Sequence, residues 1–71
     1  MDAQRMKIQL GKAIARERTA QGLSQRQLAL MSGTTQTHIS KIERAEIDVR
    51  IGSLLRISDA LGIDVRDFFS C

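Results

Sequence analysis

The sequence predicts an all-α domain of five helices, and three observations favour this fold class. The 71 residues are 42% hydrophobic but include only two aromatic residues and no proline. Apolar residues recur every three or four positions, and no segment alternates β-branched and polar residues as a strand would. Glycine or a short capping residue separates the apolar stretches. The whole chain, residues 1–71, is expected to form one domain without a linker or repeat.

The first helix is predicted from about Ala3 to Ala20. Its apolar stripe follows helical spacing and consists of Met6, Leu10, Ala13 and Ile14. Gly22 follows the last predicted turn, where a residue at positive φ commonly ends a helix.

Residues 24–44 predict two short helices joined by a tight turn. Ser24 is suited to cap the first helix, and Gln27, three residues later, completes a capping box. Gly33 stands where a helix ending at Ser32 needs positive φ, and Thr35 can cap the next helix at once. Because so short a turn forces the helices to cross steeply, the segment has the layout of a helix-turn-helix, and DNA is the expected partner.

The last two helices are predicted on either side of Gly62. One runs from about Ile51 to Leu61, and Asp64 caps the other. Phe68 and Phe69 are adjacent, so on a helix they lie about 100° apart and do not easily enter one core together. We expect these residues to form the contact between two copies of the chain; the alternative is that an irregular C-terminal tail covers both rings.

The second helix of the motif has an apolar face, Ile39 and Ile42, and a polar face without acidic residues. Glutamine can pair bidentately with adenine and lysine with guanine, and threonine can contact either base. The residues assigned to base reading are Gln36, Thr37, Ser40 and Lys41. The alternative is a polar face that is merely solvated, but the capped helix and glycine turn before it favour DNA.

The net charge of +3 hides an asymmetry. Residues 1–44 hold eight lysines and arginines against three acids, whereas residues 45–71 hold three against five. Phosphate attraction dominates the affinity of DNA-binding proteins, and the basic half is the half with the motif. The phosphate contacts predicted in this half are Arg16, Arg26, Thr35 and Arg44.

From Leu10 to Phe69 the chain resembles a phage Cro and C1 repressor-type (XRE-family) helix-turn-helix domain. The matching positions are Leu10-Gly11, Ile14, Arg18, residues 22–25, Leu28-Ala29, Gly33, Thr35-Gln36, residues 39–43, Leu54, Ile57 and residues 60–63. The resemblance implies a lambda-repressor-like fold and a dimer contact near the C-terminal helix.

The same resemblance implies roles for single residues. Gln25 would contact a phosphate and Gln36 a base, and Arg18 would pair with Glu43 to fasten the second motif helix to the first helix of the chain. The loop after the motif departs from the family pattern, because it has no proline and carries Glu46 and Asp48, which would repel phosphate if they faced it.

No catalytic, metal or cofactor site is predicted. His38 has no cysteine or carboxylate at ligand spacing, the terminal Cys71 has no base to orient it, and there is no glycine-rich phosphate loop. No apolar run is long enough to span a membrane and no leader is recognisable, so a cytoplasmic protein is expected, associated with the nucleoid when bound.

The sequence therefore predicts a dimeric, sequence-specific regulator of transcription, a repressor, that binds a double-stranded DNA operator. One alternative is an antitoxin, which would sequester a toxin or another protein partner and regulate its own operon. A second alternative is a bridging module without DNA specificity, which the base-reading residues Gln36 and Lys41 disfavour.

Overall fold

The computed structural model describes residues 2–69, so predictions about Cys71 lie outside the described residues. Four α-helices follow one another: α1 (Ala3–Ala20), α2 (Gln25–Ser32), α3 (Gln36–Glu43) and α4 (Ile51–Leu61). A 3-10 helix, η1 (Val65–Phe69), completes the described chain. The all-α class is confirmed, but the fifth element is a short 3-10 helix in place of the expected α-helix.

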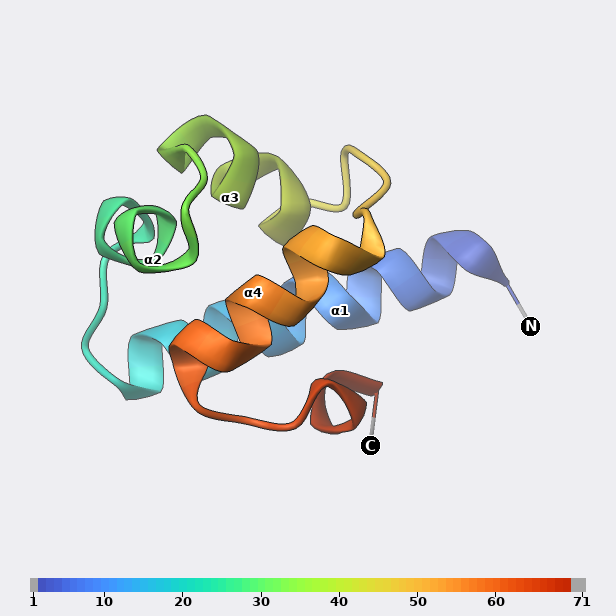
Figure 1. The fold of residues 1–71 in the computed structure, drawn as a ribbon. Coiled ribbons are helices and arrows are strands. Elements are labelled where there is room, and N and C mark those ends of the chain that lie inside the picture. Colours follow the sequence, from blue (N-terminus) through green and yellow to red (C-terminus); the bar gives the residue numbers. More distant parts are fainter. Residues whose placement is uncertain (1, 70–71) are drawn as a thin grey trace.

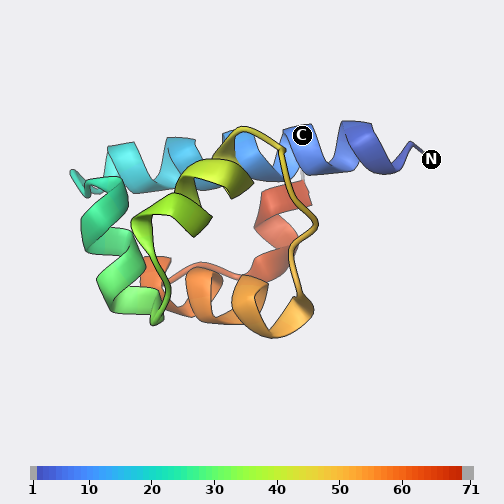
Figure 2. The ribbon, with the colours of Figure 1, turned by 90° about the horizontal axis from the view of Figure 1, so that it is seen from above.

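The helices enclose one small core. In Figure 1, α1 lies behind α4, with α2 and α3 above and beside them, and Figure 2 shows η1 returning toward α1. Every α-helix contributes to the buried apolar cluster, which is Leu10, Ala13, Ile14, Leu28, Ala29, Ile39, Ile42, Leu54, Ile57, Leu61 and Phe68. Among the described helices, none has the length and apolar character needed to cross a membrane.

All four α-helices end with the same hydrogen-bonding pattern. The first or second residue after the end adopts positive φ, and the next backbone N–H donates to a carbonyl five residues earlier, as in a Schellman motif. These bonds are Leu23 to Arg18 (3.0 Å), Thr34 to Ala29 (2.9 Å), Glu46 to Lys41 (2.9 Å) and Ile63 to Ser58 (3.0 Å). The positive-φ residue is glycine at three ends and Ala45, with φ of 59°, after α3.

The 3-10 helix differs from the predicted fifth α-helix in a way that affects the two phenylalanines. The side chain of Asp64 accepts from the Arg66 N–H at 2.9 Å, and the Asp67 N–H donates to the Asp64 carbonyl three residues earlier, which is 3-10 geometry. Phe68 is thereby buried in the core of its own chain, 1% exposed, and Phe69 packs half-buried at the edge. Phe68 is therefore not available as the dimer contact that the sequence predicted.

Helix α1 approaches the end of α3 closely at Gly11. A Cβ atom placed on Gly11 would lie 2.6 Å from the carbonyl oxygen of Ile42 and 2.7 Å from that of Glu43. Real Cβ atoms do not approach backbone oxygens so closely. The absence of a side chain at Gly11 therefore allows α1 to support the C-terminal turn of α3 directly.

Candidate nucleic-acid interface

The capped start of α2, the turn at Gly33 and the capped start of α3 form as the sequence predicts. Ser24 accepts from the Gln27 N–H at 3.0 Å while the Gln27 side chain accepts from the Ser24 N–H at 2.7 Å, so the capping box is complete. Gly33 adopts φ of 72°, and Thr35 accepts from the His38 N–H at 3.1 Å. The two helices cross steeply, as Figure 2 shows, so segment 24–44 is a helix-turn-helix.

The two faces of α3 separate as predicted. Ile39 and Ile42 are at most 2% exposed and pack into the core. Gln36, Thr37 and Lys41 are exposed. An extended molecule that lies along this face can therefore reach an amide, a hydroxyl and an ammonium group within two helical turns.

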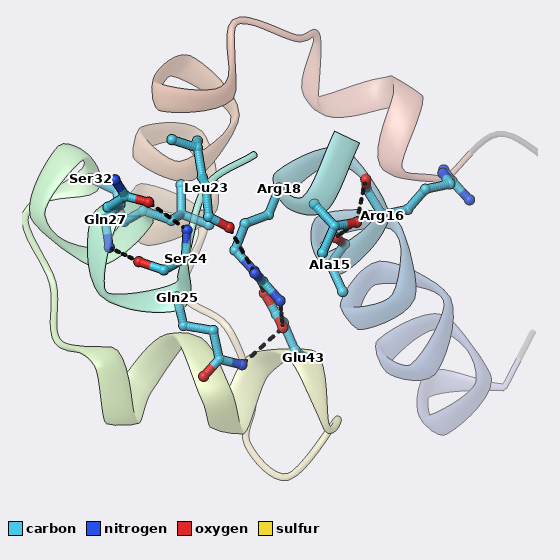
Figure 3. A network of polar contacts seen from close by, with 11 residues as sticks. Ala15, Arg16, Arg18, Leu23, Ser24, Gln25, Gln27, Ser32 and Glu43 are labelled. Carbon is cyan, nitrogen blue, oxygen red and sulfur yellow. Dashed lines mark hydrogen bonds and ion pairs between the residues drawn. The ribbon is translucent and has the colours of Figure 1, made fainter. Parts of the chain in front are cut away.

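An ion pair fastens the C-terminal end of α3 to α1. Arg18 donates from Nε to Glu43 Oε2 at 2.7 Å and from Nη2 to Oε1 at 3.0 Å. The two side chains are only 14% and 7% exposed. Arg18 Nη1 also donates to the Leu23 carbonyl at 2.9 Å, and the hydrogen bond with Glu43 raises the pKa of Arg18 above its usual value. The predicted pair is confirmed, and Figure 3 shows it between the helices.

Gln25 also hydrogen-bonds to this ion pair, a contact that the sequence does not predict. Its Nε2 donates to Glu43 Oε1 at 3.0 Å, so the first turn of α2 and the last turn of α3 meet at one carboxylate (Figure 3). An amide nitrogen carries two hydrogens, so one remains to donate to a phosphate. No local sequence signal indicates the bond, because it depends on the crossing of two helices.

The arginines assigned to phosphate have different surroundings. Arg26 is exposed on the first turn of α2, at the opposite end of this helix from the turn that leads to α3. Arg16 lines a groove of about 320 Å³ between α1 and η1, together with Arg5 and Lys12. Figure 3 shows the Arg16 side chain directed away from the Arg18–Glu43 pair. Arg26 is thus part of the helix-turn-helix, whereas Arg16 belongs to a face of α1 that adjoins η1.

Arg44 is engaged by its neighbours. Its Nε and Nη2 donate to the two carboxylate oxygens of Glu46 at 3.0 and 3.1 Å, and its Nη1 donates to Ser40 Oγ at 2.8 Å. The hydrogen bond with Glu46 raises the pKa of Arg44. The hydroxyl of Ser40, assigned to base reading, thus already accepts one hydrogen bond.

His38 is engaged by a neighbouring hydroxyl group. Its ring is half-buried, and Nδ1 shares a 2.8 Å hydrogen bond with Thr34 Oγ1. Within residues 2–69 no three histidine, cysteine or acidic side chains come together as metal ligands would. The contact instead links α3 to the turn before it.

Comparison with known proteins identifies relatives of this domain. Residues 14–68 match the family HTH_3, described as helix-turn-helix. The chain is 46% identical over 48 residues to an uncharacterized HTH-type transcriptional regulator, y4dL, of Sinorhizobium fredii, and 38% identical over 60 residues to the HTH-type transcriptional regulator PuuR of Escherichia coli. These alignments cover 68% and 84% of the chain but only 24% and 32% of the relatives.

A solved structure agrees over nearly the whole chain. The restriction-modification controller protein C.AhdI from Aeromonas hydrophila superimposes with a TM-score of 0.91 at 32% identity. The match covers 97% of this chain and 100% of that protein. All three relatives are named as regulators or controllers.

Proposed function

The chain belongs to the Cro/C1-type helix-turn-helix family of transcriptional regulators, which are not enzymes, and we propose from this premise that it binds double-stranded DNA as a homodimeric repressor. The relatives give no support to the antitoxin alternative, since those compared are regulators and controllers.

The exposed polar face of α3 carries this proposal. Gln36 stands on the first turn, where recognition helices enter the major groove, and we assign it to an adenine. Thr37 lies beside it, and Lys41, one turn beyond Thr37, is assigned to a guanine of the same half-site. Ser40 reads a base with the donor capacity that its bond from Arg44 leaves free.

Contacts to the DNA backbone would set the register of α3 in the groove. The proposed phosphate-contacting residues are Gln25, Arg26, Thr35 and Arg44. Arg16, which the sequence also assigned to phosphate, lines the groove between α1 and η1 and could reach only DNA that extends past the helix-turn-helix. Gln25 and Arg26 are the first two residues of α2, and Thr35 caps α3, so these three lie on the helix-turn-helix itself. Phosphate contacts position a protein on DNA, whereas base contacts select the sequence.

A second copy would supply the other half of the operator. Dimeric helix-turn-helix proteins read two half-sites about one helical turn apart. Phe69, half-buried at the end of η1, is the remaining candidate for the dimer contact. Occupancy of such a site would exclude other proteins from the same DNA, which is the simplest form of repression.

Selection of bound sites from random duplex DNA tests the proposal. The unmodified protein should enrich a two-fold symmetric sequence. Gln36→Ala should bind that sequence more weakly by about 1 to 3 kcal/mol and lose preference at one base pair of each half-site, while its affinity for other DNA stays nearly constant. Gln9→Ala is the matched control, because Gln9 lines the groove between α1 and η1. Failure to enrich any sequence, or an unchanged base preference for Gln36→Ala, would contradict the proposal.

A further inference from the structure

The backbone after α3 fixes the position of an acidic residue. Ala45 turns the chain at φ of 59°, and the Glu46 N–H donates to the Lys41 carbonyl at 2.9 Å. This bond holds the backbone of Glu46 against the C-terminal turn of α3, two residues after Arg44. Its carboxylate lies at the end of the helix that also carries Lys41.

This carboxylate occupies Arg44 in the way a phosphate would. Two nitrogens of Arg44 donate to the two oxygens of Glu46, while a third donates to Ser40. The fork of a guanidinium fits a carboxylate or a phosphate with the same edge, so one partner excludes the other. The pKa of Glu46 is lowered, mainly by its hydrogen bond with Arg44, so the carboxylate is charged at neutral pH.

We propose that Glu46 competes with the DNA backbone for Arg44 and thereby lowers the affinity of the protein for DNA of any sequence. The inference rests on the proposed function, because it assumes that the end of α3 approaches phosphate. The side chains of Arg44 and Glu46 are 58% and 49% exposed, and exposed ion pairs are weak, so phosphate displaces Glu46 at a modest cost.

Asp48, in the same loop, provides a control for the loss of negative charge at Glu46. Asp48 is also acidic, but its carboxylate meets Lys7 Nζ of α1 at 2.7 Å. Neutralising either residue removes one negative charge from the loop. Only the change at Glu46 frees Arg44, so the two variants separate competition for one arginine from a general gain in positive charge.

The experiment measures the dissociation constant for a duplex of arbitrary sequence over a series of salt concentrations. The proteins are the unmodified chain, Glu46→Gln, Asp48→Asn, Arg44→Ala and the double variant Arg44→Ala with Glu46→Gln. We expect Glu46→Gln to bind about two to five times more tightly, while its salt dependence changes by less than one phosphate contact, because Arg44 meets phosphate in both complexes. Asp48→Asn should tighten binding less, and Glu46→Gln should have little effect once Arg44 is gone.

Other outcomes would overturn the inference. Equal tightening with and without Arg44 would show that Glu46 acts only through general repulsion. Unchanged binding by Glu46→Gln would show that no competition exists. If the unmodified chain bound neither this duplex nor any selected site, the proposed function itself would fail, whereas normal binding with an additive double variant would overturn this inference alone.

Discussion

At the scale of single residues, the carboxylate of Glu43 is held by three hydrogen bonds close to the candidate interface. It accepts from two nitrogens of Arg18 and from Gln25, and it is almost fully shielded from water. Removing a charge from water is costly unless partners replace the lost hydration, and three hydrogen bonds do so here. Glu43 therefore orients α3 from between the helices, away from the exposed polar face of α3.

We predict that Glu43→Ala destabilises the fold by about 3 to 5 kcal/mol, because the guanidinium of Arg18 is left without its carboxylate. In a domain of this size the melting temperature should fall by more than about 10 °C, measured by circular dichroism. The double variant Arg18→Met with Glu43→Leu should recover much of the loss, since no buried charge remains. A Glu43→Ala protein that melts within a degree or two of the unmodified chain would contradict this.

The sequence predicts those residues of the site whose positions follow from helical periodicity. The caps at Ser24 and Thr35 and the opposite faces of α3 fall in this group, whereas the Arg18–Glu43 pair was implied by the family resemblance. The sequence does not predict the hydrogen bond from Gln25 to Glu43 or those from Arg44 to Glu46. The first depends on how α2 crosses α3, and the second on the turn at Ala45, where no glycine marks the positive φ.

At the scale of helices, Ala45 is the exception among the four helix ends. A left-handed conformation costs a residue with a Cβ roughly 1 to 2 kcal/mol, and glycine avoids this cost but gains entropy in the unfolded chain. We predict that Ala45→Gly raises the free energy of unfolding by about 0.5 to 1 kcal/mol, measured by denaturant titration. Ala15→Gly within α1 is the control, and it should lower stability by about 1 kcal/mol. Destabilisation by both changes would refute the argument.

The packing of α1 against α3 gives a second prediction at this scale. In Gly11→Ala the new methyl group would overlap the carbonyl oxygens of Ile42 and Glu43, so α3 must shift and stability must fall. Gly52→Ala in α4 is the matched control, since its Cβ would meet only the Arg56 side chain at 3.7 Å. Thermal melts should show a clear loss for Gly11→Ala and a gain of up to about 1 kcal/mol for Gly52→Ala. Equal effects would contradict the close approach.

The fifth element shows where sequence patterns stop being sufficient. Asp64 as a cap and Phe68 as an apolar residue both favour a helix, and the sequence does not distinguish an α-helix from a 3-10 helix over five residues. The choice depends on burying the Phe68 ring against α1, which is a tertiary effect. The two adjacent rings do separate, since Phe68 enters the core and Phe69 stays at its edge, but helical spacing does not identify which ring is buried.

At the scale of the whole molecule, positive charge is spread over more than one face. Arg26, Lys41 and Arg44 lie on or beside the helix-turn-helix, while Arg5, Lys12 and Arg16 line the groove between α1 and η1. The asymmetry between the halves of the sequence is real, but it does not map onto one surface. A count of charges along the chain therefore overestimates how many cations can meet one DNA duplex.

We predict that assembly into a dimer depends on Phe69, because Phe68 is buried in the core of its own chain. The ring lines an apolar groove of about 390 Å³ with residues of α1, α4 and the loop between α3 and α4. Covering an exposed aromatic surface with a second copy is favourable, and two-fold dimers are the commonest oligomers of soluble proteins. We expect sedimentation at micromolar concentration to show dimers, and Phe69→Lys to give folded monomers that bind the selected operator weakly.

Phe68 supplies the contrast for this experiment. Because its ring is 1% exposed, Phe68→Ala should cost about 3 to 5 kcal/mol of folding stability and lower the melting temperature, whereas Phe69→Lys should leave the fold of the monomer largely intact. The two adjacent rings thus separate folding from assembly, because one is enclosed by its own chain and the other is left at the edge. A monomeric unmodified protein at roughly 50 µM, or dimers that persist in Phe69→Lys, would place the dimer contact elsewhere or exclude it.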